Sequence, residues 1–148
     1  MSLFRVERSS ALPAEEMWRR LTDFRTHGRL VPLTRTRLLS PGPMGVGSRF
    51  VARTGIGRLA FDDLMEVVHW EPPASGRSGT CRLEKRGRVV LGRVAIEVYG
   101  APGGSRAVWV EELRVRGVPR ALDPVLDPVL ALAGRWLFGR AMDGLLGS

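Results

Sequence analysis

The sequence has few of the residues that usually mark a disulfide, a metal site or a covalent catalyst. Among its 148 residues Cys81 is the only cysteine, which excludes an internal disulfide and fits a reducing compartment. His27 and His69 are the only histidines, and neither stands at metal-ligand spacing, so we expect no metal and no cofactor. The Gly-x-Ser-x-Gly elbow and the phosphate-loop ending Gly-Lys-Ser/Thr are also absent.

Long hydrophobic runs are lacking as well. Residues 1–8 contain no apolar core of signal-peptide length. The most apolar stretch, residues 123–146, is interrupted by Arg135, Arg140 and Asp143, whereas a membrane-spanning helix needs about 20 predominantly apolar residues. We therefore expect no membrane span and a cytoplasmic protein.

Lysine is nearly absent, because Lys85 is the only lysine among 23 basic residues. We interpret this skew as coding bias. The formal net charge of +8 is compatible with nucleic acid, anionic lipid or another acidic partner. The arginines are scattered, however, and no basic run is interleaved with aromatic residues, so we expect no nucleic-acid partner.

Alternation of apolar and polar residues predicts that most of the chain is strand. The predicted strands cover residues 3–8, 34–39, 49–56, 59–70, 80–86, 89–99 and 107–115. Short turns join the later strands without intervening helices, which indicates one antiparallel meander in a single domain of residues 1–148. Near the end of the predicted strand 49–56, Gly55 and Gly57 make a β-bulge possible. A one-residue slip in strand register at this point would turn the Thr54 side chain outward.

Three segments have helical patterns. The first begins at Pro13, and the second covers residues 23–27 with Gly28 as its stop. The third is the long C-terminal segment, which begins at Asp123 or at Asp127, because Pro128 implies either a new start or a kink. Its apolar stripe comprises Leu122, Leu126, Val129, Leu130, Ala133, Leu137 and Met142.

Several stretches together resemble one known superfamily. They are residues 13–18 with 21–24, 44–50, 67–73, 109–113 and 137–140. In this order they are similar to the START-like, helix-grip proteins, also called SRPBCC or polyketide cyclase/dehydrase and lipid-transport proteins. The resemblance implies an α+β fold in which a curved antiparallel sheet of about seven strands wraps around the C-terminal helix. It also implies an apolar cavity between helix and sheet, but no shared catalytic motif, so catalytic residues stay unassigned.

Strand alternation then indicates which polar groups face this cavity. Asp62-Asp63 and Glu111-Glu112 cannot act as dyads within themselves, because successive strand side chains point to opposite faces. One member of each pair, Asp63 and Glu111, shares the inward face. Either carboxylate could instead lie in water at the cavity mouth or pair with a helix arginine such as Arg140. The predicted cavity residues are Trp18, Phe50, Thr54, Phe61, Asp63, Met65, Trp109, Glu111, Val129, Ala133 and Leu137.

The resemblance implies binding of a hydrophobic or amphipathic small molecule, lipid-like or polyketide-like, in this cavity. One alternative is an enzyme of the cyclase/aromatase or dehydratase type, in which inward polar residues position an enolisable carbonyl. Another is a non-catalytic interaction module whose cavity is vestigial. The sequence leaves open the ligand, the pathway and whether the protein is a monomer or a homodimer.

Overall fold

A computed structural model describes residues 2–31, 33–117 and 120–146. The elements are β1 (Ser2–Ser10), α1 (Ala14–Leu21), α2 (Phe24–Leu30), β2 (Thr34–Leu38), β3 (Arg49–Thr54), β4 (Phe61–Glu71), β5 (Gly79–Arg86), β6 (Val90–Ala101), β7 (Gly104–Val115) and α3 (Asp123–Leu146). Two short 3₁₀ turns, Gly57–Leu59 and Arg120–Leu122, precede β4 and α3. This order confirms the predicted α+β class.

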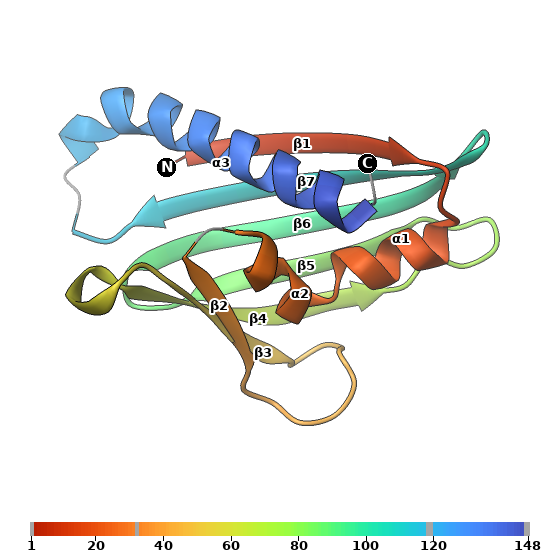
Figure 1. Ribbon diagram of the computed structural model, residues 1–148, viewed down its shortest axis with the longest axis horizontal. Helices are drawn as coiled ribbons and strands as arrows, with labels where there is room; N and C mark the ends of the chain where they lie inside the picture. Colours follow the sequence, from red (N-terminus) through yellow and green to blue (C-terminus); the bar gives the residue numbers. More distant parts are fainter. Residues whose placement is uncertain (1, 32, 118–119, 147–148) are drawn as a thin grey trace.

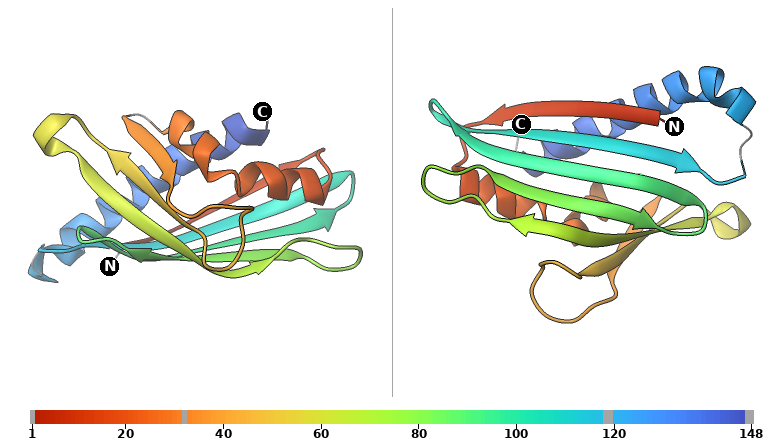
Figure 2. Two further views of the ribbon diagram at one scale, coloured as in Figure 1. Left: turned by 90° about the horizontal axis from the view of Figure 1, so that it is seen from below. Right: turned by 180° about the vertical axis from the view of Figure 1, so that it is seen from behind.

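The seven strands form one antiparallel sheet in the order β1-β7-β6-β5-β4-β3-β2. All three helices lie on one face, toward which β2 and β3 curl, and the opposite face carries no helix among the described residues (Figures 1 and 2). The helix α3 crosses this concave face and packs along β1. The sheet therefore grips α3 as the helix-grip resemblance implies. Within the described ranges, no helix has the length and hydropathy needed to cross a membrane.

The core lies between α1, α3 and the middle of the sheet. Met17 and Leu21 of α1 are fully buried, as are Ile96 and Val98 of β6. Each such side chain contributes roughly 1.5–3 kcal/mol by leaving water. The local sequence favours α1, because its acidic residues stand in the first turn and its basic residues in the last, where they complement the helix dipole.

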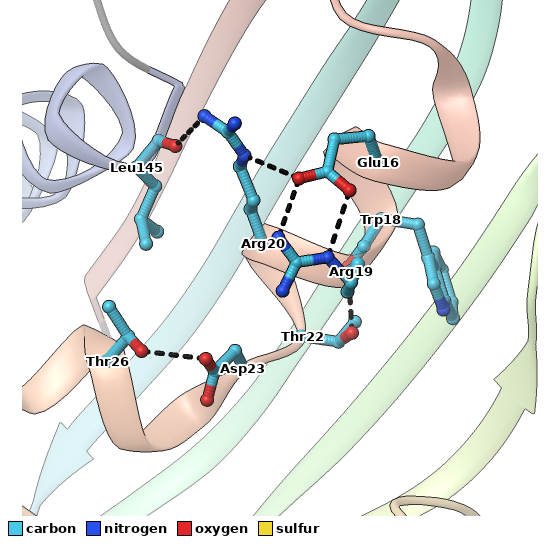
Figure 3. A network of polar contacts seen from close by, with 8 residues as sticks. All are labelled: Glu16, Trp18, Arg19, Arg20, Thr22, Asp23, Thr26 and Leu145. Atoms are coloured by element: carbon cyan, nitrogen blue, oxygen red, sulfur yellow. Dashed lines mark hydrogen bonds and ion pairs between the residues drawn. The ribbon is translucent and has the colours of Figure 1, made fainter.

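A polar network joins α1 to the end of α3 (Figure 3). Glu16 Oε1 accepts a hydrogen bond from Arg20 Nε at 2.9 Å, and Arg19 Nε donates to Glu16 Oε2 at 2.9 Å. Hydrogen bonds from Arg19 and Arg20 lower the pKa of Glu16 to about 2. Arg20 Nη1 also donates to the carbonyl oxygen of Leu145 at 3.0 Å, so the two helices are connected where both cover the same end of the sheet.

Two predicted boundaries were wrong. The helix α2 does not stop at Gly28 but continues to Leu30, and Val31 is then extended. Proline disfavours helical geometry at the residue that precedes it, so Pro32 explains the end of α2 better than Gly28 does. The strand β3 ends at Thr54 rather than at Ile56, and the apolar side chains of Ile56 and Leu59, which the predicted strands included, are exposed.

Gly55 explains why β3 stops. Its φ is +115°, and a Cβ at this position would lie 2.5 Å from the carbonyl oxygen of Leu59. The chain therefore turns tightly here instead of forming a bulge within the strand. Thr54 keeps its inward phase, with its hydroxyl 2.9 Å from that of Thr34 on β2.

The helix α3 begins at Asp123 and continues through Pro128. The predicted apolar stripe is wrong at three positions, because Leu122, Val129 and Ala133 are exposed. Val129 belongs to an outward apolar row with Val125, Leu132 and Trp136. The predicted stripe is too wide for a helix that contacts the sheet along one side.

Candidate functional site

A cavity of about 320 Å³ lies between α3 and the concave face of the sheet. This volume is at the low end of the range for small-molecule sites. The walls are mostly apolar and include Phe4, Phe24, Phe50, Leu83, Val115, Leu130 and Phe138. Such a space favours a compact apolar ligand body.

Three charged side chains meet at the wall of this cavity. Lys85 of β5 lies between Asp63 of β4 and Glu111 of β7. The Lys85 Nζ atom is 2.6 Å from Asp63 Oδ2 and 2.9 Å from Glu111 Oε1. The side chains of Lys85 and Glu111 are each 3% exposed, and that of Asp63 is 15% exposed. These three residues are called the charged trio below.

Burial and mutual attraction oppose each other in the trio. Burial acts to lower the pKa of Lys85, but the attraction of Glu111 and Asp63 outweighs it, so the pKa lies above its ordinary value and Lys85 is an ammonium ion. Burial raises the pKa of Asp63, although Lys85 acts in the opposite direction. A buried ion pair adds little net stability compared with apolar residues of the same size. Its presence in an apolar cavity therefore points to function rather than to folding.

The strand β6 has a glycine beside the charged trio. Gly92 stands directly opposite Lys85 on one side and Leu113 on the other. Its φ is +139°, and a Cβ would lie 2.0 Å from the carbonyl oxygen of Glu112. Any other residue would strain the backbone here. Gly92 therefore allows β6 to approach the backbone of β7 closely, next to Glu111.

Aromatic rings form the wall beside the trio. Trp109 stacks on His27 with centroids 5.3 Å apart and on Phe138 at 5.5 Å. Phe24 and Phe50 stack at 4.4 Å. Burial lowers the pKa of His27 to about 4, so its ring is neutral near pH 7.

Four buried polar atoms at this wall have no hydrogen-bond partner among the described residues. They are Asp63 Oδ1, Glu111 Oε2, His27 Nε2 and Trp109 Nε1. All four residues line the cavity. Because buried polar atoms are rarely left unsatisfied, these four are the natural contacts for a polar group inside the cavity.

The structure places nine of the eleven predicted cavity residues at the wall. These are Phe50, Thr54, Phe61, Asp63, Met65, Trp109, Glu111, Ala133 and Leu137. Trp18 of α1 is not part of the cavity wall, because its ring packs edge-on against the ring of Trp70 on β4. Val129 is 60% exposed, and its neighbour Leu130 lines the cavity instead. The carboxylates pair with Lys85, and Arg140 lies over the ring of Trp136.

Sequence reasoning missed Lys85 and His27. Lys85 is in phase with the inward residues Cys81 and Leu83, so strand alternation alone would have placed it inside. Its status as the only lysine among 23 basic residues was a second signal. His27 had no such signal, because its position depends on how α2 packs against β2 and α3.

The remaining reactive groups of the chain lie outside this arrangement. Cys81 is fully buried in the core, and burial raises the pKa of its thiol to about 12, so it is not a nucleophile at neutral pH. In the part of the chain that the structure describes, no three His, Cys, Asp or Glu side chains cluster as metal ligands would. The chemistry of the cavity therefore comes from the charged trio and its two ring neighbours.

Known structures share this fold at low sequence identity. A protein from Thermus thermophilus superposes with a TM-score of 0.73 and 13% identity, over 98% of this chain and 94% of that one. The Zhui aromatase/cyclase from Streptomyces gives a TM-score of 0.68 at 14% identity, over 98% and 92%. Norcoclaurine synthase from Thalictrum flavum, in complex with dopamine and hydroxybenzaldehyde, gives 0.62 at 16% identity, over 97% and 85%. At these identities the likeness establishes the fold alone.

A search of curated proteins found no match to the sequence. The family described as "Polyketide cyclase / dehydrase and lipid transport" matches residues 1–148. That span includes every strand, the three helices and the charged trio. The protein therefore belongs to the polyketide cyclase/dehydrase and lipid transport family.

Proposed function

We propose that the protein binds a hydrophobic or amphipathic small molecule in the cavity between α3 and the sheet. The observation that carries this proposal is the cavity of about 320 Å³, which combines apolar walls with four unsatisfied buried polar atoms. Apolar walls provide affinity, and a few placed polar groups provide orientation. The family description, which includes lipid transport, supports the same reading.

A bulky residue in the cavity tests this proposal. Ala52 lines the cavity and stands opposite Asp63 across the β3–β4 ladder. Ala52→Phe therefore directs a ring into the ligand space. Binding of the neutral fluorescent dye N-phenyl-1-naphthylamine is measured, and we expect the affinity to fall at least tenfold, which is about 1.4 kcal/mol.

Val51→Phe is the matched control, because Val51 is the next residue and points to the opposite face. It should leave dye affinity unchanged. Mass spectrometry of organic extracts from the purified protein provides a second readout. Recovery of no ligand, together with no dye binding, would refute the proposal.

A second candidate function is catalysis of the cyclase or dehydratase type on a polyketide-like substrate. The observation that favours it is the pair of carboxylates, Asp63 and Glu111, at the wall of an apolar cavity. Burial raises the pKa of Asp63, and a less acidic carboxyl group is a stronger base. Asp63 would accept the proton from carbon next to a carbonyl, and Trp109 Nε1–H would donate a hydrogen bond to the oxygen that gains charge.

Proton exchange measures this activity without knowledge of the natural substrate. NMR follows deuterium uptake at the α-carbon of 2-tetralone, a compact aromatic ketone. Wild-type protein should accelerate uptake, and Asp63→Asn should reduce the acceleration about 10²–10⁴-fold. Asp62→Asn, on the opposite face, is the control. Equal rates of deuterium uptake with and without protein would refute this catalytic function and leave ligand binding as the proposed function.

The third reading, an interaction module with a vestigial cavity, is the least supported. It requires a collapsed core between α3 and the sheet. The cavity volume of about 320 Å³ and the buried charges at its wall argue for an occupied site instead.

A further inference from the structure

The donors of the charged trio are already used within the trio. An ammonium group has three hydrogens and no lone pair. The Nζ atom of Lys85 directs them toward Asp63 Oδ2 at 2.6 Å, Glu111 Oε1 at 2.9 Å and Met65 Sδ at 3.7 Å. Lys85 therefore offers an entering anion no strong hydrogen bond, although it is the cation nearest to the cavity wall.

The unsatisfied atoms are mainly acceptors. Asp63 Oδ1 and Glu111 Oε2 are carboxylate oxygens without a partner among the described residues. The neutral ring of His27 leaves Nε2 unsatisfied, and its contacts with the backbone of Leu21 and Arg20 engage the other nitrogen, so Nε2 is an acceptor. Trp109 Nε1–H is the single donor of the four.

The net charge of the trio also favours ligand groups that donate hydrogen bonds over groups that carry a negative charge. With two carboxylates and one ammonium group the trio carries a charge of −1. Glu111 is 2% exposed, so water screens this charge weakly on the cavity side. A second negative charge beside it would meet repulsion, and among the four unsatisfied groups only Trp109 could donate a hydrogen bond to it.

We propose that the cavity selects ligands whose polar end donates hydrogen bonds, such as a phenol, an alcohol or an ammonium group, and rejects carboxylates, phosphates and sulfonates. Such an end donates to Asp63 Oδ1 and Glu111 Oε2, and a hydroxyl also accepts from Trp109. The inference rests on the proposed binding function and adds the chemical class of the ligand. It opposes the overall charge of +8, which would by itself attract acids.

Three naphthalene compounds of nearly equal shape test the selection. They are 2-naphthylmethylamine, 2-naphthalenemethanol and 2-naphthoate, and calorimetry at pH 7 measures their affinities for the wild-type protein. We expect the amine and the alcohol to bind at least tenfold more tightly than the acid, because unpaired buried polar groups discriminate strongly. The neutral dye used above is measured alongside.

Variants then localise the effect to the trio. Asp63→Asn and Glu111→Gln each remove one negative charge inside the cavity. Each should lower the ratio of the affinity for the amine to the affinity for the acid about tenfold. Asp62→Asn and Glu112→Gln remove the same charge on the outer face and should leave the ratio unchanged. Circular dichroism checks the fold of each variant. If Glu111→Gln fails to fold, the less buried Asp63→Asn provides the comparison.

The outcomes separate this inference from the binding proposal. If the dye binds but 2-naphthoate binds as tightly as the amine and the alcohol, selection by the trio is refuted. The same conclusion follows if the dye binds and none of the three compounds does, or if the outer variants change the ratio as much as the inner ones. If neither dye nor naphthalene compounds bind, the binding function itself fails and the inference falls with it.

Discussion

The concave face of the sheet has two ends that differ in what covers them. At the packed end, Met17 and Leu21 of α1 belong to the same hydrophobic core as Cys81 and Ile96, and all four are fully buried. At the hollow end, Lys85 of β5 and Glu111 of β7 line a cavity instead. Along β5 the inward row passes from Cys81 through Leu83 to Lys85 within one strand.

The two ends have separate tasks. At the packed end the helix α1 fills the space above the sheet. The hydrogen bond from Arg20 to the carbonyl oxygen of Leu145 connects this helix to α3. The free energy of burial of α1 stabilises the fold. The hollow end has buried charged groups, which add little stability compared with apolar groups of the same size and which suit ligand binding. Substitutions at the two ends should therefore change different properties.

The largest effect is expected from Lys85→Met at the hollow end. It removes the cation and leaves two buried carboxylates without a counter-ion, which costs about 3–5 kcal/mol of unfolding free energy. Urea unfolding at pH 7 measures the loss. The matched control is Arg86→Met, because the neighbouring Arg86 pairs with Glu66 and Glu84 at the surface and such pairs contribute about 0–1 kcal/mol.

Neutralising the partners should reverse most of that loss. The triple variant Asp63→Asn, Lys85→Met, Glu111→Gln has no unpaired charge in the cavity, so it should be more stable than Lys85→Met alone. A Lys85→Met protein as stable as Arg86→Met would mean that the trio is not an electrostatic unit. It would also remove the distinction between the two ends.

The second prediction contrasts two leucines. Leu21→Ala at the packed end opens a cavity in a closely packed core and should cost about 2–5 kcal/mol, without changing the amine-to-acid ratio of ligand binding. Leu137→Ala at the hollow end enlarges an existing space beside a half-buried side chain, so it should cost less than about 2 kcal/mol but alter dye affinity. Chemical unfolding and dye titration are measured on both. Equal losses of stability would show that the ends are equally packed.

How much of this contrast could be predicted from the sequence depends on the kind of signal. Alternation placed Asp63 and Glu111 inward, because β4 pairs without a register shift from Phe61 to Val67 and β7 does so along its whole length. It failed at Ile56 and Leu59, where a glycine with φ +115° ends the strand and the tight turn moves both side chains into solvent. Periodicity therefore works within a strand and stops at its end.

Packing between elements was harder to predict. His27 reaches Trp109 of β7 from α2, which packs against β2 and α3, and a seven-residue helix gives no sequence signal for its docking angle. Val129 points outward because contacts with β1 set the rotation of α3. Lys85 could have been found by applying to β5 the alternation already used for β4 and β7. The compositional explanation of the single lysine obscured it.

The third prediction concerns His27, which lies between the two ends. Its pKa is lowered from 6.5 to about 4 because burial disfavours the charged ring. Between those values the unfolded chain binds a proton that the folded chain does not, so stability is fully present above pH 6.5 and falls as the pH decreases toward 4. At 1.36 kcal/mol per pH unit, the loss is about 3 kcal/mol.

His27→Gln removes this group, so the difference in unfolding free energy between wild type and variant should depend on pH over that window. Urea unfolding from pH 4 to pH 8 measures it. His69→Gln, at the other histidine, is the control and should keep the wild-type profile. Parallel profiles for wild type and His27→Gln would contradict the burial of an uncharged ring beside the cavity.

The smallest effect is expected from a pair of glycines at the two ends of β6. Gly92 stands at the hollow end opposite Lys85 with φ +139°, and an added Cβ would lie 2.0 Å from the carbonyl oxygen of Glu112. Gly92→Ala should therefore cost about 1–3 kcal/mol through backbone strain. Because Glu112 adjoins Glu111, the required shift of β7 should also weaken binding of the amine probe.

The control is Gly100→Ala. Gly100 lies near the other end of β6, where an added Cβ meets nothing within 4 Å, so this substitution should change neither stability nor amine binding. Thermal unfolding and calorimetry on the two variants measure both effects. If Gly92→Ala is as stable as Gly100→Ala and binds the amine equally well, the close approach of β6 to β7 at Gly92 has no part in placing Glu111 at the cavity.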